Sequence, residues 1–493
     1  MKLKVKRLHL LTGKPVCMIH EKTAKKLSFH VGYRVLIQTK KKLEIISVID
    51  TVSGSLIKEN EIGVSEEIFD ILKIKNKDFV EVTLAERPRS IELIKKKLAG
   101  KKLSKKEIHE IIINIAKNSL TEVEVAFFIS AVYTHELNLQ ETKWLIDAMV
   151  DSGNKINISG KIVDKHCIGG IAGNRTTPIV VAICAANDLI MPKTSSRAIT
   201  SAAGTSDTIE TIAKVDFSIN QIKKIIKKTN ACLVWGGALG LAPVDDKIIK
   251  IEKTIKIDST SQLLASILSK KISVGSKYVL IDIPYGKSAK VNKKQAKILK
   301  YKFNQLGKMF KLKMKVILTN GTEPIGNGIG PSLEIKDVIK VLNKDIDAPK
   351  DLEEKSLILA GKILELTKTT KNGYKKALET LNSKKAYKKF IQIIKAQDGK
   401  ITNIKKAKFS FDINSNIKIK IIHLDNKFIN SLARRAGCPE DKNAGVYIHK
   451  KKGEIVEKKN PIITIYAETQ EKLNHAKKYF KKYHNKSIIF REI

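Results

Sequence analysis

The spacing of apolar residues changes along the chain and predicts different structure in successive regions. Residues 1–86 contain short runs in which apolar and polar positions partly alternate, such as YRVLIQ and LEIISVIDTV. Alternation of this kind is typical of β-strands. Residues 87–153 change to helical spacing, as in IHEIIINIA and VAFFISAVYT. The pattern therefore predicts a small N-terminal β-rich domain followed by a helical domain.

Strands and helices alternate farther along the chain, which predicts a multidomain α/β protein. The runs ACLVW and YVLIDIP are continuously apolar, as buried strands are. Residues 243–275 return to helical spacing, so we predict a discontinuous helical domain formed by 87–153 and 243–275. A large α/β domain with a mixed sheet would then comprise 154–242 and 276–407. Residues 408–493 alternate strands with glycine-marked turns and end in a helix near 472–483, which predicts a C-terminal α+β cap.

Residues 161–210 show the pattern strand, small-residue loop, helix twice in succession. We predict the strands at 161–164 and 189–192, and the helices from near 175 and from about 206. Loops rich in Gly, Ser and Thr that precede a helix bind anions, because backbone N–H groups, hydroxyls and the helix dipole all favour negative charge. Lys165, Lys193 and Arg197 add positive charge, and an arginine can hold a phosphate group with two hydrogen bonds. Ordinary polar turns are the alternative, but two loops in tandem, both with cations, favour a phosphate site.

The charge balance raises the question of a nucleic-acid partner. The net charge is +43, and a charge of this size permits non-specific binding to nucleic acids. However, the excess consists mostly of lysines spread along the whole chain, and aromatic residues make up only 5%. Few aromatic side chains leave little for base stacking. We therefore expect no specific nucleic-acid partner and attribute the charge to a compositional bias.

Cysteine usage and hydropathy point to a cytoplasmic protein. The five cysteines are scattered and form no CxxC pair, which argues against a zinc site or a disulfide framework and for a reducing compartment. No apolar run reaches the length of a membrane span, and the basic start lacks the apolar segment of a signal peptide. We expect neither a metal nor a membrane partner.

Several motifs in the same order carry a family resemblance. KTSSRAITSAAGTSDTIE at 193–210 resembles the Ser-x-Arg-x5-(Gly/Ala)-Gly-Thr-x-Asp-x-x-Glu pattern of the thymidine/pyrimidine-nucleoside phosphorylase family. DKHCIGG at 164–170 resembles that family's Asp-Lys-His-Ser-x-Gly-Gly phosphate loop. LIDAMVDSG, LAPVDDK, LLASILSKK and TEPIGNGIGPSLE match further family blocks, so the resemblance covers roughly residues 90 to 493. The TSSRAITSAAGT variant and the extra N-terminal domain are similar to the archaeal AMP phosphorylase subgroup.

The resemblance implies a pentosyltransferase that needs no cofactor and uses inorganic phosphate as a co-substrate. Phosphate would convert AMP, and also CMP and UMP, to the free base and ribose 1,5-bisphosphate. We also expect a homodimer or a larger homo-oligomer, because the extra N-terminal β-rich domain carries no catalytic motif and we interpret it as structural or oligomer-forming. The alternatives are a pyrimidine-nucleoside (thymidine) phosphorylase, a phosphoribosyltransferase and a nucleic-acid-binding protein.

Departures from the thymidine phosphorylases favour the subgroup. Those enzymes hold the pyrimidine with an arginine fifteen residues before the serine of the ASIxSKK block, and Ile251 occupies that position here. Cys167 replaces the phosphate-loop serine and could be a weak donor or merely a packing residue. Ser196 replaces the usual glycine and adds a hydroxyl where the subgroup must hold a 5′-phosphate.

The subgroup pattern assigns roles to named residues. Asp258 would be the proton donor, which requires a raised pKa, although an aspartate before Ser259 is also typical of a helix N-cap. The wider family pattern implies that Lys165 and Ser195 contact phosphate. His166 could contact substrate or be an ordinary loop histidine, and Lys270 could bind substrate or lie on the surface. The implied nucleotide contacts are Gly170, Ser196, Arg197, Ala198, Ile199, Thr200, Ser201, Thr205, Ser266 and Lys290.

Overall fold

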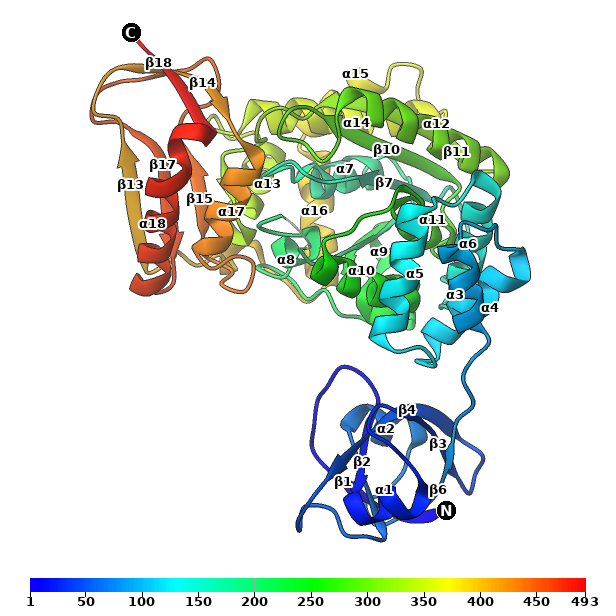
Figure 1. The fold of residues 1–493 in the computed structure, drawn as a ribbon. Coiled ribbons are helices and arrows are strands. Elements are labelled where there is room, and N and C mark those ends of the chain that lie inside the picture. Colours follow the sequence, from blue (N-terminus) through cyan, green and yellow to red (C-terminus); the bar gives the residue numbers. More distant parts are fainter. Residues whose placement is uncertain (199–200) are drawn as a thin grey trace. The chain divides into compact units, whose positions relative to one another are not determined.

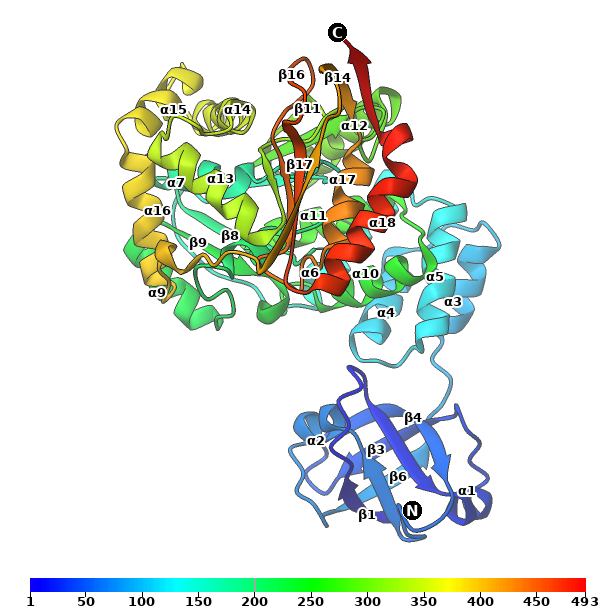
Figure 2. The same cartoon turned by 90° about the vertical axis from the view of Figure 1, so that its left-hand side faces the viewer.

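The computed structural model describes residues 1–198 and 201–493, and of Asn403 only the backbone. The predicted contacts at Ile199 and Thr200 therefore lie outside the described residues. The chain divides into two compact units, one formed by 1–153 with 242–266 and the other by 154–241 with 267–493. Figures 1 and 2 show the elements of each unit from two directions. The four-domain division proposed above stays a prediction.

The N-terminal region of the first unit is a closed β-barrel with the strand order β1-β5-β2-β4-β3-β6. A closed barrel has no free strand edge, and the apolar positions of its alternating strands point into one core. The alternation predicts strands in YRVLIQ and LEIISVIDTV, which are β3 and β4, and also in LKVKRLHLL and FVEVTLA, which contain β1 and β6. The short strands β2 and β5 were not predicted. The elements are β1 (Lys2–Arg7), β2 (Val16–His20), α1 (Glu21–Leu27), β3 (Arg34–Thr39), β4 (Glu44–Val52), β5 (Glu61–Val64), α2 (Glu66–Leu72) and β6 (Phe79–Leu84).

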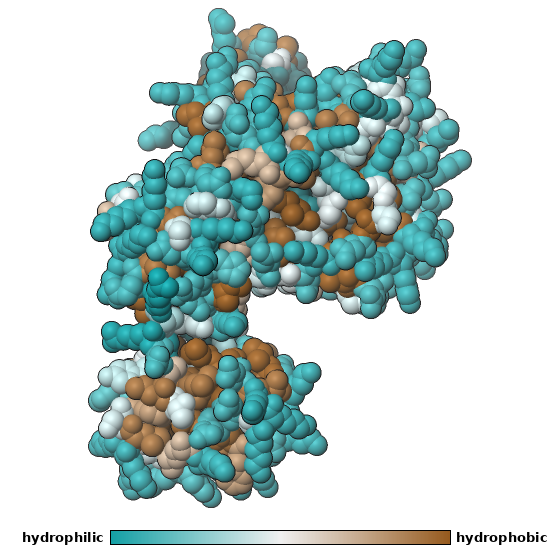
Figure 3. All heavy atoms as spheres, turned by 90° about the vertical axis from the view of Figure 1, so that its right-hand side faces the viewer, coloured by the Kyte–Doolittle hydropathy of each residue, from teal (hydrophilic) through white to brown (hydrophobic). Residues whose placement is uncertain are grey.

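The outer surface of the barrel is unusually apolar on one face. Figure 3 shows hydrophobic side chains gathered over the barrel, whereas polar side chains cover most of the remaining surface in that view. Leu11 is 86% exposed and Phe79 54% exposed. An exposed apolar patch usually marks a surface that contacts another molecule.

The helical part of the first unit has the boundaries that its capping residues predict. The Ser104–Glu107 and Thr121–Glu124 capping boxes are both present, as expected from their spacing. Ile251, at the position of the family's arginine, is buried in α10. The elements are α3 (Ser90–Leu98), α4 (Lys105–Ala116), α5 (Glu122–Thr134), α6 (Leu139–Asp151), α10 (Pro243–Ile255) and the start of α11 (Thr260–Ser273).

The second unit is built on a sheet in which every strand pair that the structure describes is parallel. The order is β11-β10-β7, and the bridge from Ile162 to Ile190 continues it to β8 and β9. The mixed sheet expected above is therefore replaced by a parallel one. Helices connect these strands, and parallel neighbours require such crossover connections. The elements are β7 (Val163–Cys167), α7 (Thr176–Ala185), β8 (Met191–Ser195), α8 (Thr205–Ile209), α9 (Ile219–Thr229), β9 (Ala231–Trp235), η1 (Gly237–Leu239), β10 (Tyr278–Tyr285), α12 (Lys293–Met309) and β11 (Lys313–Asn320).

Further helices bury α7 in the core of this unit, and the C-terminal subdomain follows. Every residue of α7 is buried, and α14 and α16 pack against it. The helices are α13 (Pro331–Asn343), α14 (Lys350–Leu366), α15 (Gly373–Asn382) and α16 (Lys385–Ala396). The C-terminal elements, with the short β12 and η2 before them, are β12 (Gly328–Ile329), η2 (Ile401–Asn403), β13 (Phe409–Asn414), β14 (Ile419–Leu424), α17 (Asn426–Arg435), β15 (Gly445–Ile448), β16 (Ile455–Val456), β17 (Pro461–Ala467), α18 (Gln470–Ser487) and β18 (Ile488–Glu492).

The predicted C-terminal helix is α18, whereas α17 was not foreseen and a strand follows α18. The C-terminal core also includes Ala172 and Ala202, which lie in the αβ region more than two hundred residues before α17.

None of the described helices is long and apolar enough to cross a membrane. Residues 1–198 and 201–493 contain no group of three or more His, Cys, Asp and Glu side chains arranged to hold a metal ion.

Candidate active site

The first loop, residues 168–175, joins β7 to α7 and begins later than the sequence predicted. Lys165, His166 and Cys167 lie in the strand itself, because pairing with β10 continues as far as Cys167 and Asp282. Their side chains therefore alternate between the two faces of the sheet. The helix begins at Thr176 after Arg175, which confirms the predicted start near residue 175.

One face of the end of β7 carries a buried cluster of charges. Asp164 Oδ1 lies 3.0 Å from Lys193 Nζ, and its Oδ2 lies 2.6 Å from Lys271 Nζ. Burial alone would raise the pKa of Asp164, but the two lysines more than offset this and hold it below its usual range. Burial and the lysines Lys271, Lys193, Lys165 and Lys270 keep the pKa of His166 well below its usual range. Burial lowers the pKa of Lys271 to about 7, so this lysine is partly protonated at neutral pH. The cluster thus combines one carboxylate with the cation Lys193, a partly protonated Lys271 and a neutral histidine, and a bound anion would favour full protonation of Lys271.

Lys165 lies on the opposite face of the strand and points to the start of α7. Its Nζ donates hydrogen bonds to Thr176 Oγ1 (2.8 Å) and Thr177 Oγ1 (3.3 Å). Burial lowers its pKa to about 8, so the side chain is still mostly protonated at neutral pH. A cation at a helix N-terminus, where unpaired N–H groups collect, is a favourable arrangement for phosphate. The role of Lys165 as a phosphate contact stays a prediction.

The second loop follows β8 and is described at 196–198 and 201–204. Ser195 is the last residue of β8, beyond the end predicted for that strand, and its Oγ is buried with no hydrogen-bond partner among the described residues. The same holds for Thr194 Oγ1 and for Asn174 Oδ1 in the first loop. Buried polar atoms normally find partners, so these three atoms are available to a ligand or to bound water.

The second loop folds back closely on itself. A side chain at Gly204 would come within 2.4 Å of the carbonyl oxygen of Ser196. Asp207, buried in the first turn of α8, accepts hydrogen bonds from the backbone N–H groups of Gly204 (2.8 Å) and Ala198 (2.7 Å). The Ser201 hydroxyl donates to the carbonyl of Ala203. These contacts hold the backbone at Ala198 and Gly204.

Arg197 has a different role from the phosphate grip expected above. Its guanidinium donates two hydrogen bonds to Glu210 (2.6 and 2.7 Å) and packs over the ring of Trp235. Hydrogen bonds from Arg197, offset in part by burial, help to lower the pKa of Glu210 to about 2. The side chain is therefore engaged by the chain's own carboxylate, and only the backbone of Arg197 stays a predicted nucleotide contact.

Arg175 joins the two loops. Its guanidinium donates to Thr205 Oγ1 (2.8 Å), to the carbonyl oxygen of Ala203 (2.7 Å) and to Glu334 Oε2 (2.6 Å). Arg175 and Glu334 are both buried. Burial raises the pKa of Glu334, and the charge of Arg175 partly offsets it. The predicted contact Thr205 is thus held by an ion pair that the sequence analysis did not identify.

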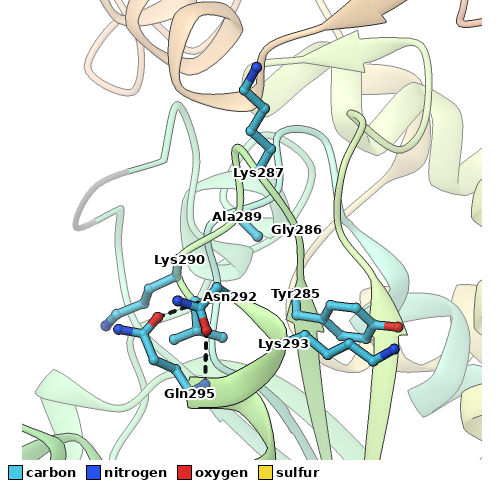
Figure 4. A pocket seen from close by; sticks show the side chains of 9 residues that line it. Tyr285, Gly286, Lys287, Ala289, Lys290, Asn292, Lys293 and Gln295 are labelled. Carbon is cyan, nitrogen blue, oxygen red and sulfur yellow. Dashed lines mark hydrogen bonds between the residues drawn. The ribbon is translucent and has the colours of Figure 1, made fainter.

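The third loop, residues 286–292, joins β10 to α12 and carries Lys290. Lys290 lines a hollow of about 450 Å³ together with residues of the start of α12. Figure 4 shows the lining side chains. The first loop approaches it closely: a side chain at Gly170 would lie 2.7 Å from the backbone nitrogen of Lys290. Gly170 has φ +92°, a conformation that glycine adopts most readily. The structure thus brings the predicted contacts Gly170 and Lys290 together.

Asp258 and Ser266 belong to the first unit. Asp258 is exposed in the turn between α10 and α11, and Ser259, not Asp258, caps α11, because Ser259 Oγ accepts from the backbone N–H of Gln262 (3.1 Å). The Ser266 hydroxyl donates to Asp245 Oδ2 (2.9 Å). Lys270 belongs to the second unit, where it helps lower the pKa of His166.

The residues that hold the loops in place were not among those that the sequence motifs predicted. Asp207 and Glu210 are part of the quoted 193–210 motif, so their spacing could have suggested a structural role. Glu334 lies in the TEPIGNGIGPSLE block, but nothing in its spacing pointed to Arg175. Such pairs join segments that are far apart in the sequence, and only tertiary structure makes them visible.

Comparisons with known proteins give the family. Residues 91–153 match the "Glycosyl transferase family, helical bundle domain" and residues 159–387 the "Glycosyl transferase family, a/b domain". Residues 421–486 match the "Pyrimidine nucleoside phosphorylase C-terminal domain". Anthranilate phosphoribosyltransferase from Thermus thermophilus has a similar fold, with a TM-score of 0.52 and 15% identity over 62% of this chain and 99% of its own. That likeness concerns the fold alone.

Three relatives narrow the assignment. The chain is 38% identical to AMP phosphorylase 1 of Archaeoglobus fulgidus, with 96% of this chain and 94% of the relative covered. It is 40% identical to the AMP phosphorylase of Methanococcoides burtonii, with 97% and 95% covered. A Legionella pneumophila protein provisionally named a thymidine phosphorylase is 40% identical, with 91% and 87% covered. The chain therefore belongs to the thymidine phosphorylase family of pentosyltransferase-type phosphorylases. Within that family its similarity to the AMP phosphorylases extends over nearly the whole chain, the N-terminal barrel included.

Proposed function

We propose that the chain cleaves the N-glycosidic bond of AMP with inorganic phosphate. An oxygen of phosphate forms a bond to C1′ while the bond from C1′ to the base breaks, and the bonding electrons leave with adenine. The products are adenine and ribose 1,5-bisphosphate. The observation that carries the proposal is the pair of anion-type loops with buried cations and a Ser195 hydroxyl that has no partner among the described residues, in a chain similar to AMP phosphorylases over nearly its whole length.

The reaction needs two anions held close together, which explains the loops. Lys165, the start of α7 and Ser195 would bind inorganic phosphate. The described backbone of the second loop, together with Thr205 and Lys290, would bind the nucleotide. These groups supply N–H donors, hydroxyls and positive charge, the groups that hold phosphate oxygens. No cofactor is needed, because phosphate itself is the nucleophile.

The departing adenine requires a proton, which we assign to Asp258. An aspartic acid is ionised at neutral pH unless burial or nearby negative charge raises its pKa. Asp258 is exposed in this structure, so bound substrate must provide that environment. The charges of the two phosphate groups and the exclusion of water by the base would both act in this direction. Ser266 would contact the nucleotide beside it.

Other parts of the proposal follow from the family. We propose that CMP and UMP are also substrates, and that the enzyme acts as a homo-oligomer in the cytoplasm. Thymidine phosphorolysis is the second candidate, and the Legionella relative supports it. Against it, Ile251 is buried and apolar where the thymidine enzymes place an arginine.

Phosphate-dependent release of base from AMP and from thymidine, measured side by side, tests the proposal. We expect turnover with AMP and little or none with thymidine. Turnover of thymidine without turnover of AMP would reject the proposed substrate. We also expect Asp258→Asn to lose most activity on AMP while its affinity for the nucleotide, measured by calorimetry, stays close to that of the wild type. Near-normal turnover in that variant would remove Asp258 as the acid.

A further inference from the structure

Two asparagines of α17 contact the substrate loops directly. Asn426 Oδ1 accepts a hydrogen bond from the backbone N–H of Ala172 in the first loop (3.0 Å). Asn430 Oδ1 accepts one from the backbone N–H of Ala202 in the second loop (3.0 Å). The asparagines are four residues apart and therefore lie on one face of the helix. One helix of the C-terminal subdomain thus pairs with the backbone of both loops.

Asn426 also reaches the third loop. Its Nδ2 donates to Ser288 Oγ (3.0 Å) and to the carbonyl oxygen of Gly321 (3.1 Å). The Ser288 hydroxyl in turn donates to the carbonyl of Thr322. An asparagine side chain has two N–H donors and one carbonyl acceptor, and Asn426 uses all three groups on different segments.

The hydrogen bonds of Asn426 and Asn430 to the loops are buried, and neighbouring groups orient α17 and the Asn430 amide. Asn426 is fully buried and Asn430 is 7% exposed, so water cannot replace their hydrogen bonds. Asn430 Nδ2 donates to the carbonyl of Asn426, which orients its amide. The start of α17 is anchored by Glu323, which accepts from the backbone N–H of Leu424 (2.8 Å) and pairs with His423 (2.6 Å).

Packing supports the same connection. Ala172 and Ala202 are both fully buried and belong to the hydrophobic core of the C-terminal subdomain, with Phe428 and Ile429 of α17. Loops rich in small polar residues cannot hold themselves rigid, because they lack both a core and a hydrogen-bond ladder of their own. The C-terminal subdomain supplies both.

We propose that Asn426 and Asn430 are positioning residues that hold the three substrate loops in register for phosphorolysis. The proposal rests on the proposed function for its kinetic consequences. An amide suits this task because it donates and accepts hydrogen bonds without charge. A carboxylate at the same place would bring negative charge toward a site that must hold two anions.

Kinetics of Asn426→Ala and Asn430→Ala test the proposal. A displacement of about 1 Å in groups that position a substrate can cost roughly 100-fold in rate, so we expect kcat/KM for AMP to fall by about 10- to 100-fold. The KM for phosphate should rise, because the loops bind phosphate before the chemical step. The matched control is Leu473→Ala, which opens the same core from α18 but contacts neither loop through the hydrogen bonds described.

The control decides between positioning and general stability. At temperatures well below unfolding we expect Leu473→Ala to keep kcat/KM and the KM for phosphate within about twofold of the wild type. The proposal is overturned if the asparagine variants also stay within twofold, or if Leu473→Ala loses as much activity as they do.

Hydrogen exchange in the unaltered protein provides a test that needs neither folding of a variant nor turnover. We expect the amides of Ala172 and Ala202 to exchange as slowly as those of α17. Exchange as fast as that of an exposed turn, with α17 still protected, would overturn the proposal. If the wild type fails to phosphorolyse AMP while these amides are protected, the proposed function fails and the attachment of the loops to α17 stands.

Discussion

At the scale of single residues, the site is defined by charges that the fold has removed from water. Asp164 is buried between Lys193 and Lys271, and Lys165 is buried at the start of α7. A buried charge is costly unless it is paired or meets a ligand of opposite sign. The pairing of Asp164 leaves a positive excess at the ends of β7 and β8, and this excess is what an anionic substrate would neutralise.

The pKa of Lys165 makes phosphate binding dependent on pH. Burial lowers this pKa to about 8 in the free protein, and bound phosphate favours the charged form. We therefore expect the KM for phosphate to rise above pH 8 by up to about tenfold per pH unit. Initial rates at varied phosphate between about pH 8 and 9.5 measure this, because below that range phosphate itself and Lys271, whose pKa burial lowers to about 7, also change charge. In Lys165→Met the KM should be high and insensitive to pH in that window, and a flat wild-type profile would contradict the prediction.

Alanine substitutions at Gly169 and Gly170 would separate the effect of backbone strain from the effect of a steric clash with a neighbouring loop. Gly169 and Gly170 have φ values of +90° and +92°, so alanine is strained at both positions. Nothing lies within 4 Å of a side chain at Gly169, whereas one at Gly170 meets the backbone of Lys290 at 2.7 Å. We expect Gly170→Ala to lower kcat/KM about 100-fold and Gly169→Ala to lower it far less. Equal losses in steady-state assays would show that the close approach of the loops does not matter.

At the scale of elements, helices hold each loop at the carboxyl end of a parallel strand. The first loop runs from β7 into α7, and the second from β8 into α8. Asp207 fixes the second loop from α8, whereas Glu334 of α13 reaches it through Arg175. The geometry of the site thus depends on α13, an element that follows the loops by more than a hundred residues.

The ion pair of Arg175 and Glu334 predicts coupled losses of stability and activity. Removing one partner of a buried pair leaves an unpaired charge and costs about 3–5 kcal/mol. We expect Glu334→Gln to lower the thermal midpoint and to raise the KM for AMP, because Thr205 loses its orientation. The control is Glu110→Gln, whose pair with the exposed Arg89 spans 3.6 Å and should be worth about 0–1 kcal/mol. Differential scanning fluorimetry and initial rates would measure both effects, and an unchanged KM in Glu334→Gln would contradict the role.

At the scale of the whole molecule, the predicted site residues fall in two compact units. The phosphate loops and Lys290 belong to one unit, while Asp258 and Ser266 belong to the other. The helix α11 contains residues of both units. The expectation that the net charge of +43 has no specific nucleic-acid partner stays a prediction.

The apolar surface of the barrel predicts self-association. Leu11 is 86% exposed and Phe79 54% exposed, and covering such surface is favourable. We expect Leu11→Lys combined with Phe79→Lys to reduce the size of the assembly in sedimentation velocity while activity per chain is kept. Ile346→Lys is the matched control, because Ile346 is fully exposed outside the barrel. An unchanged assembly in the double variant would exclude these two side chains from the contact.

The sequence by itself determined the local elements and the family. Apolar periodicity placed most helices and the buried strands, since the period of an element is a property of neighbouring residues. Capping boxes such as Ser104–Glu107 can also be identified from the sequence, because both partners lie within one helical turn. Collinear motifs gave the family and hence the candidate residues, whose roles in substrate binding and catalysis remain predictions.

Only the tertiary structure decided how the loops are held and which charges are available. In the structure, Lys165 lies in a strand, the guanidinium of Arg197 pairs with Glu210, and Ser259 caps α11. It also joined Asn426 and Asn430 to loops more than two hundred residues earlier in the chain. Hydrogen bonds and ion pairs depend on distance in space. The sequence alone does not show that residues 172 and 426 lie close together, because folding brings them into contact.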